Sequence, residues 1–128
     1  MLQLAKQLLR SGYQGQISLI YANVSPQDIM LKDDVDELAA RHANFSVHYV
    51  VDKVAAGQTW TGGVGYVTAD MLRARMPPPG NDSLVLVCGP PGMMKAISGE
   101  KVSPKDQGPL TGLLAEPLGY TAAEVFKF

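Results

Sequence analysis

The chain has 128 residues, of which 46% are hydrophobic and 18% are charged, a composition typical of one globular domain with a single core. A formal net charge of −1 and the lack of a polybasic stretch argue against a nucleic-acid or anionic membrane partner. No apolar run approaches the roughly 20 residues of a membrane span, and the N-terminus has no signal-peptide or other targeting pattern. The single cysteine, Cys88, excludes an internal disulfide framework and a multi-cysteine metal site. We therefore predict one domain over residues 1–128.

The first half of the chain alternates helical and strand patterns. Residues 1–10 predict an amphipathic helix, and residues 16–23 form a short apolar run suited to a buried strand. A second helix is predicted from Ser25 to about residue 42, with Ser25 as its N-cap. Residues 45–51 predict the next strand.

The second half continues the alternation after a glycine-containing loop. A helix capped by Thr68 is predicted to run to residue 75, before the break at Pro77-Pro78-Pro79-Gly80. The remaining predicted elements are a strand at 84–88, a helix at 93–97, a helix at 110–118 and a terminal strand at 124–128. Alternating strands and helices predict an α/β fold with a mostly parallel sheet.

Ligands of such sheets bind beyond the carboxyl ends of the strands. Three groups occupy these positions in the sequence: Ala22-Asn23, Asp52, and the turn Cys88-Gly89-Pro90-Pro91. Asp52 can accept hydrogen bonds from an adenosine ribose, and it can equally be an ordinary turn aspartate. The usual dinucleotide glycine fingerprint does not precede it.

Two glycine-rich segments have a functional and a plain interpretation. Gly62, Gly63 and Gly65 either let the backbone approach a ligand or simply make a tight loop. The turn after Cys88 either holds a planar ring beside a helix start or merely follows a buried strand cysteine. No metal site is predicted, because His42 and His48 lie on different elements.

Several segments, in order along the chain, carry a resemblance to one family. Leu84 to Met93 (LVLVCGPPGM) resembles the CGPP-x-M signature of the ferredoxin-NADP-reductase-like superfamily, in its cytochrome b5 reductase and nitrate reductase branch. The segments Tyr21-Ala22-Asn23, Val50-Val51-Asp52-Lys53 and Trp60 to Val67 (WTGGVGYV) resemble other motifs of that branch. The stretch from Ile97 to Tyr120 is similar to the fungal mitochondrial reductases.

The resemblance implies a Rossmann-like fold and a role for each matching residue. Ala22, Asn23, Gly63, Gly65 and Tyr66 would line the bound dinucleotide. Asp52 would favour NADH over NADPH, while Gly89, Pro90, Pro91 and Met93 would hold the nicotinamide end. Cys88 would lie at the point of hydride transfer to FAD, as a positioning group and not as a nucleophile, and Phe128 would lie on the flavin side. The family also implies cytochrome b5 as the electron acceptor and a mitochondrial location, in the outer membrane or the intermembrane space.

The family has further segments that have no counterpart in this chain. It carries an FAD-binding barrel domain and a Gly-x-Gly-Ile-Thr-Pro segment before the residue that matches Met1. Residues 1–128 are therefore expected to be a partial NAD(H)-binding domain, without the first, central strand. Because the strands at 16–23 and 84–88 would lose their shared neighbour, we expect a rearranged sheet, a dimer that fills the gap, or marginal stability.

Three functions follow as hypotheses. The first is the NADH domain of a reductase that passes a hydride to FAD and electrons to cytochrome b5, with this chain alone inactive. The second is a nucleotide-binding fragment without catalysis. The third is an interaction role through exposed sheet edges, including self-association. Within the enzyme class, the alternative is the reductase end of a nitrate reductase.

Overall fold

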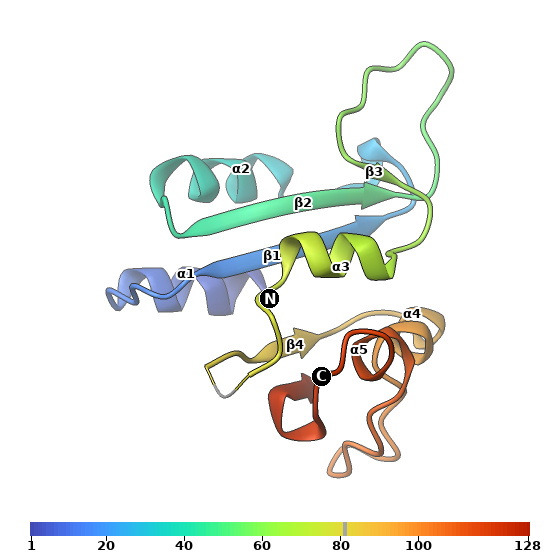
Figure 1. Cartoon of the computed structure of the whole chain (residues 1–128). Coiled ribbons are helices and arrows are strands. Elements are labelled where there is room, and N and C mark those ends of the chain that lie inside the picture. Colours follow the sequence, from blue (N-terminus) through green and yellow to red (C-terminus); the bar gives the residue numbers. More distant parts are fainter. Residues whose placement is uncertain (81) are drawn as a thin grey trace. The chain divides into compact units, whose positions relative to one another are not determined.

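In a computed structural model of the chain, which describes residues 1–80 and 82–128, the strands form two separate parallel sheets (Figure 1). Residues 1–67 make one compact unit and residues 68–128 make another. The first unit holds a three-stranded sheet, and the second holds a two-stranded sheet. The predicted α/β class with parallel strands is confirmed.

The first unit contains six elements. In chain order they are α1 (Leu2–Arg10), β1 (Ile17–Asn23), η1 (Pro26–Asp28), α2 (Lys32–Arg41), β2 (Phe45–Val51) and β3 (Gly63–Val64). Its sheet has the order β1-β2-β3, with Ile17 paired to Phe45 and Val50 paired to Gly63. The short strand β3 lies in the segment that the sequence predicts only as a loop.

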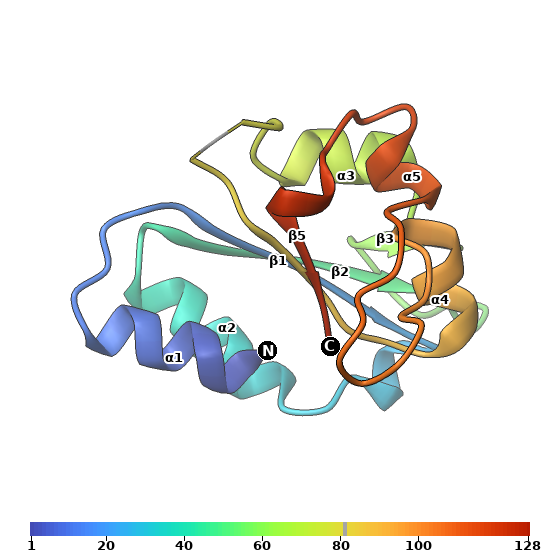
Figure 2. The ribbon, with the colours of Figure 1, turned by 90° about the horizontal axis from the view of Figure 1, so that it is seen from below.

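The core of the first unit lies between its helices and one face of its sheet. Ala5 and Leu9 from α1, Val35 from α2 and Phe45 from β2 are buried together. Partly buried apolar side chains pack against this group: Leu2, Ile17, Leu19, Leu38, Ala39, Val47 and Tyr49. Figure 2 shows α1 and α2 on the same side of the strands. The predicted helical stripe at residues 1–10 is therefore explained, since its apolar residues cover the sheet.

The predicted helix from Ser25 to residue 42 is wrong in its first part. The segment instead forms the 3-10 turn η1, and α2 starts only at Lys32. Leu31 precedes α2 with a φ of 58°, a left-handed conformation that interrupts a continuous right-handed helix. The Ser25 hydroxyl donates to the Asp28 carboxylate at 2.6 Å rather than capping a helix through the backbone.

A polar cluster attaches α2 to β2. The Tyr49 hydroxyl donates to Asp36 at 2.6 Å, and the Lys32 ammonium binds the same carboxylate at 2.7 Å. Burial raises the pKa of Tyr49, and its hydrogen bond to Asp36 adds to the rise. Burial raises the pKa of Asp36, but hydrogen bonds from Lys32 and Tyr49 outweigh this, so the net shift is downward. Asp36 therefore links helix α2 to strand β2, a role that the sequence analysis does not assign to it.

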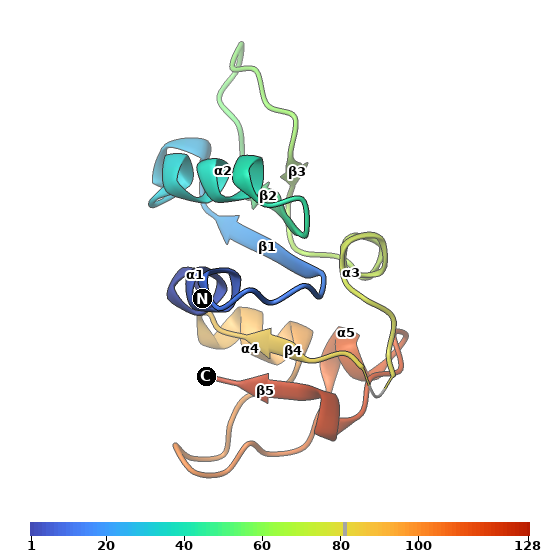
Figure 3. The same ribbon diagram turned by 90° about the vertical axis from the view of Figure 1, so that its left-hand side faces the viewer.

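The second unit contains the remaining elements. They are α3 (Ala69–Arg75), β4 (Val85–Val87), α4 (Pro91–Ile97), α5 (Gly112–Ala115), η2 (Ala122–Glu124) and β5 (Val125–Lys127). Strands β4 and β5 are parallel neighbours, with Val85 paired to Val125 (Figure 3). Alternate strand residues are buried, as are Met94, Ile97 and Leu114 from the helices.

Three sequence predictions in this unit can be judged. The Thr68 side chain accepts a hydrogen bond from the Met71 N–H at 3.2 Å, which confirms it as a helix cap. Helix α4 begins at Pro91 and not at Met93, because proline tolerates the first helical turn, where its missing N–H has no partner. The predicted helix at 110–118 shrinks to the four residues of α5.

Candidate nucleotide site

The carboxyl ends of β1 and β2 bring together Asn23 and Asp52. The Asp52 N–H donates to the backbone carbonyls of Asn23 and Val24, at 3.1 and 3.0 Å. These bonds continue the parallel ladder past Val51 and hold the two chain segments side by side. The side chains of Ala22 and Asp52 are exposed. The structure therefore places these three predicted site residues at the same edge of the sheet.

The Asn23 side chain carries an unusual feature. Its Nδ2 atom is buried and has no hydrogen-bond partner among the described residues. A buried amide donor without a partner costs free energy, and such groups in proteins commonly await water or a ligand. The Gln58 Oε1 atom, in the loop between β2 and β3, is buried and unpartnered in the same way. The sequence patterns do not single out Gln58, because a glutamine in a loop carries no motif signal.

The glycine run beside this edge is shaped by close backbone contact. A Cβ on Gly62 would overlap the Tyr49 carbonyl, so this position has no room for a side chain. Gly65 has a φ of +99°, a conformation that side chains rarely adopt, and its N–H donates to Val51 at 2.8 Å. Gly63 is a residue of β3, and its carbonyl accepts a bond from the Trp60 indole at 3.1 Å. The glycine run is therefore held against the end of β2 by backbone contacts and hydrogen bonds.

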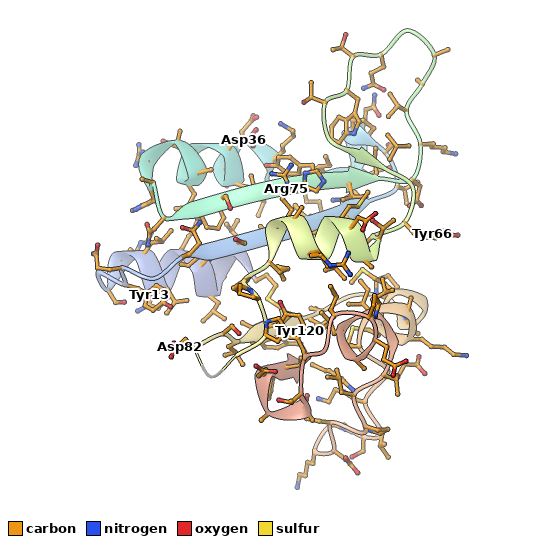
Figure 4. All side chains as sticks on the ribbon, in the orientation of Figure 1. Tyr13, Asp36, Tyr66, Arg75, Asp82 and Tyr120 are labelled. Carbon is orange, nitrogen blue, oxygen red and sulfur yellow. The ribbon has the colours of Figure 1, made fainter. Side chains whose placement is uncertain are left out.

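Tyr66 follows this run and is almost fully solvated. Its relative exposure is 88%, and its side chain projects from the ribbon in Figure 4. An aromatic side chain left in water at the carboxyl edge of a sheet is available to stack on a planar ligand. The loop between β2 and β3 extends well beyond the strand ends (Figure 1).

The second group of predicted residues lies at the end of β4, in the other unit. Cys88 is exposed directly after the strand. Gly89, Pro90 and Pro91 are exposed in the turn that leads into α4. A Cβ on Gly89 would overlap the terminal methyl of Met93, so glycine lets the methionine lie over the turn. Of the two methionines, Met94 is a core residue, whereas Met93 is only half-buried.

The C-terminal strand presents two phenylalanines to solvent. Phe126 and Phe128 are 45% and 56% exposed, and their rings meet edge to face with centroids 5.1 Å apart. The Phe128 N–H donates to the Val87 carbonyl at 3.0 Å, so the last residue is fixed to β4. Val125 and Lys127 alternate with them and are buried on the opposite face. The apolar exposed face therefore comes from the strand's alternation.

Lys127 is a buried residue to which sequence reasoning assigns no role. It is 2% exposed, and its ammonium donates to the carbonyls of Gln107 and Pro109, each at 2.9 Å. Burial lowers the pKa of Lys127. The Gln107 carboxamide accepts from the Lys127 N–H at 2.7 Å and donates to the Lys127 carbonyl at 2.9 Å. The period of two in Val-Phe-Lys-Phe is the signal that could have found this buried lysine.

The two groups of predicted residues therefore belong to different units. Six of them, Ala22, Asn23, Asp52, Gly63, Gly65 and Tyr66, lie in the first unit, around the carboxyl edge of its sheet. The other five, Cys88, Gly89, Pro90, Pro91 and Met93, surround the end of β4. The described residues contain no cluster of three or more His, Cys, Asp or Glu side chains suited to a metal. None of the helices within those residues is long and apolar enough to cross a membrane.

Comparison with known proteins identifies relatives of the chain. An NADH-cytochrome b5 reductase 2 of Aspergillus clavatus is 50% identical over the whole chain, and an NADH-cytochrome b5 reductase-like protein of Arabidopsis thaliana is 53% identical over 88% of it. The chain spans 40% and 34% of the lengths of these two proteins.

A solved structure shares the fold. The cytochrome b5 reductase domain of Ulva prolifera nitrate reductase matches 98% of this chain, and 42% of its own, with a TM-score of 0.77 at 25% identity. The model of the oxidoreductase NAD-binding domain family matches residues 1–99, well over half of the sequence. The chain therefore belongs to the oxidoreductase NAD-binding domain family.

Proposed function

We propose that the chain is the NADH-binding part of a flavin-dependent reductase that transfers a hydride from NADH to FAD and then electrons to cytochrome b5. The observation that carries this proposal is the pairing of Asn23 and Asp52 at the carboxyl ends of adjacent parallel strands, in a chain of the NAD-binding family. Relatives named NADH-cytochrome b5 reductase support the choice of nucleotide and acceptor.

The first unit fits the adenosine and phosphate part of a dinucleotide. The exposed Asp52 carboxylate can accept hydrogen bonds from ribose hydroxyls, and its charge would repel the additional phosphate of NADPH. The unpartnered Asn23 amide supplies a donor for a ligand oxygen. In the proposed complex Ala22, Gly63 and Gly65 let the ligand approach the backbone, and Tyr66 packs against it.

The turn after β4 fits the nicotinamide end. Gly89, Pro90 and Pro91 leave a rigid surface without long side chains, and Met93 covers the base of the turn. We place the exposed Cys88 thiol at the reacting end of the nucleotide, where it would position the ring without forming a bond. When bound, NADH supplies the hydride and FAD accepts it, so the protein's task is to set distance and angle.

The remaining parts of the proposal rest on similarity to relatives. Residues 1–128 would be a partial NAD(H)-binding domain, and a separate barrel domain would hold most of the FAD. The exposed rings of Phe126 and Phe128 are suited to contact with a planar ligand, which supports the proposal that Phe128 lies on the flavin side. The proposed location is mitochondrial, in the outer membrane or the intermembrane space. We also propose that the chain self-associates through an exposed sheet edge, independently of nucleotide.

One observation favours a second enzyme. The solved structure with a TM-score of 0.77 is the cytochrome b5 reductase domain of a nitrate reductase. In that case the nucleotide site would be unchanged, and only the electron acceptor would differ. A nucleotide-binding fragment without turnover would also use the same residues.

The test is calorimetric titration of the chain with NADH and, separately, with NADPH. We expect NADH to bind more tightly than NADPH. Replacing Asp52→Asn should weaken NADH about tenfold, because a neutral amide accepts ribose hydrogen bonds less strongly than a carboxylate. The same replacement should reduce the ratio of NADH affinity to NADPH affinity, because the negative charge that repels the additional phosphate of NADPH is removed.

Asp82→Asn is the matched control, because Asp82 is an exposed aspartate that precedes the amino end of β4. It should leave both affinities unchanged. Equal NADH binding by the wild type and Asp52→Asn, with both proteins folded by circular dichroism, would contradict the site.

A further inference from the structure

We propose that Lys53 is a second specificity-determining residue of the nucleotide site, and that its ammonium binds the additional phosphate of NADPH. The inference rests on the proposed function, in which Asp52 contacts the adenosine ribose. Asp52 alone would only repel that phosphate. With Lys53 beside it, the site accepts NADPH as a weaker ligand than NADH.

The backbone fixes Lys53 at the same strand end as Asp52. The N–H groups of both residues donate to the Val24 carbonyl, that of Asp52 at 3.0 Å and that of Lys53 at 3.2 Å. Two consecutive N–H groups that share one acceptor turn the chain, whereas those of a continuing strand point to opposite sides. The alternation of side chains along β2 therefore ends at Val51, and the side chains of Asp52 and Lys53 are both exposed beyond it.

The Lys53 ammonium is available to a ligand. Among the described residues, it forms no ion pair and no hydrogen bond, and it does not pair even with the adjacent Asp52 carboxylate. By contrast, the ammonium of Lys32, at the start of α2, is bound to Asp36 at 2.7 Å. Lys53 can therefore bind an anion without first breaking a contact within the chain.

The sequence also leaves Lys53 as a single cation at this edge of the sheet. The segments that follow the three strands of the first unit are residues 24–31, 52–62 and 65–68, and Lys53 is their one Lys or Arg. Their other charged residues are Asp52 and Asp28, and Asp28 accepts a hydrogen bond from Ser25. A phosphate that approaches these segments is repelled by carboxylates and attracted by Lys53 alone.

The chemistry of NADPH matches a carboxylate and an ammonium on consecutive residues. NADPH differs from NADH by a phosphate on the 2′ oxygen of the adenosine ribose, the oxygen that Asp52 would bind as a hydroxyl. The phosphate is therefore attached next to the carboxylate, where the adjacent residue can reach it. A lysine ammonium has three donors on a flexible four-carbon stem, and it binds phosphate as a point charge. Lys53 thus offsets part of the repulsion by Asp52.

Calorimetric titration with NADH and with NADPH tests the inference. Lys53→Gln should weaken NADPH binding about fivefold, the effect of one exposed ion pair, and should weaken NADH binding by less. The ratio of NADH affinity to NADPH affinity should therefore rise, which is the opposite of the change expected for Asp52→Asn. Lys53→Arg should retain NADPH binding, because a guanidinium also pairs with phosphate.

Arg10→Gln is the matched control. It removes the same positive charge from an exposed position in the last turn of α1, which leads to the amino end of β1. This control should leave the ratio of the two affinities unchanged. As a second measurement, added salt should weaken NADPH binding more in the wild type than in Lys53→Gln, because screening acts on a contact that the variant lacks.

The outcomes separate the inference from the proposed function. Equal weakening of NADH and NADPH by Lys53→Gln would overturn the inference alone, because the lysine would then contact a group that both nucleotides share, such as the pyrophosphate. Unchanged affinities of Lys53→Gln for both nucleotides would also overturn it, with the site at Asp52 intact. If the folded wild type bound neither nucleotide, the proposed function would fail and the inference with it.

Discussion

The strands β1 and β5 are both edge strands, but the hydrogen bonding of their outward-facing backbone groups differs. At β5, the Gln107 carboxamide binds both the N–H and the carbonyl of Lys127, as a neighbouring strand would. At β1, the odd-numbered residues bond to β2, and the backbone groups of Ser18, Ile20 and Ala22 point to the other side. Among the described residues, no side chain hydrogen-bonds to these groups. A single side chain, that of Gln107, therefore satisfies the outward groups of Lys127 at β5. At β1, three residues have outward groups without such a partner among the described residues.

The difference shows how little is needed to close a short edge. Strand β5 has three residues, and its N–H and C=O groups at Val125 and Lys127 point to the outer side. The Val125 N–H bonds to the Ala122 carbonyl, and Gln107 binds both groups of Lys127. One carboxamide therefore satisfies the accessible pair. Strand β1 has seven residues, so a single side chain could not satisfy its edge, and another strand is the natural partner. Edge length thus decides whether a side chain can substitute for a strand.

Opening the closed edge should give the largest effect. Gln107→Ala removes two hydrogen bonds to the Lys127 backbone and leaves a half-buried N–H and carbonyl without partners. We expect the free energy of unfolding to fall by about 2 kcal/mol, from the loss of two bonds at roughly 1 kcal/mol each. Urea denaturation followed by circular dichroism measures this. Hydrogen exchange at the Lys127 amide should quicken as well.

The matched control is Gln14→Ala. The Gln14 amide also bonds to a backbone carbonyl, that of Gly12 at 2.9 Å, but at an exposed position. Its loss should change stability by less than about 0.5 kcal/mol, as is usual for surface substitutions. If Gln107→Ala were as mild as Gln14→Ala, the β5 edge would not depend on the glutamine.

Much of the fold is predictable from sequence because its elements have clear periods. The apolar runs at residues 16–23 and 45–51 predict β1 and β2 to within a residue. The helix predicted after Ser25 begins too early, because the left-handed conformation at Leu31 interrupts it and no sequence pattern marks that residue. The two-residue strand β3 could not be predicted from the sequence, because it forms only through its long-range pairing with Val50 and Val51.

The site is predictable in position and not in detail. Strand ends in a parallel α/β fold point to Asn23 and Asp52, and the structure brings these two together. The burial of the Asn23 amide and of the Gln58 oxygen could not be predicted, because it depends on how the loop between β2 and β3 packs and no sequence pattern indicates that packing. The ligand roles of all eleven predicted residues stay predictions until binding is measured.

The smallest expected effect is the pH dependence of stability that the buried Lys127 contributes at β5. Burial lowers its pKa in the folded chain below the ordinary value of 10.5. Between the lowered pKa and 10.5, the unfolded chain therefore binds more protons than the folded chain. Stability contributed by this residue must rise with pH across that window, and burial of the charge must cost free energy below it.

Lys127→Met removes the titrating group while filling similar space. We expect the stability of the wild type, measured relative to Lys127→Met by urea denaturation, to increase between pH 7 and pH 10. Taking the difference matters because Tyr120 works in the opposite direction. Burial raises the Tyr120 pKa, so its contribution falls once the pH passes 10. Lys95→Met, at an exposed position on α4, should show no such trend. A flat difference for Lys127→Met would mean that the ammonium keeps its hydration. The edge at β5 would then be held by Gln107 alone, without help from the lysine beneath it.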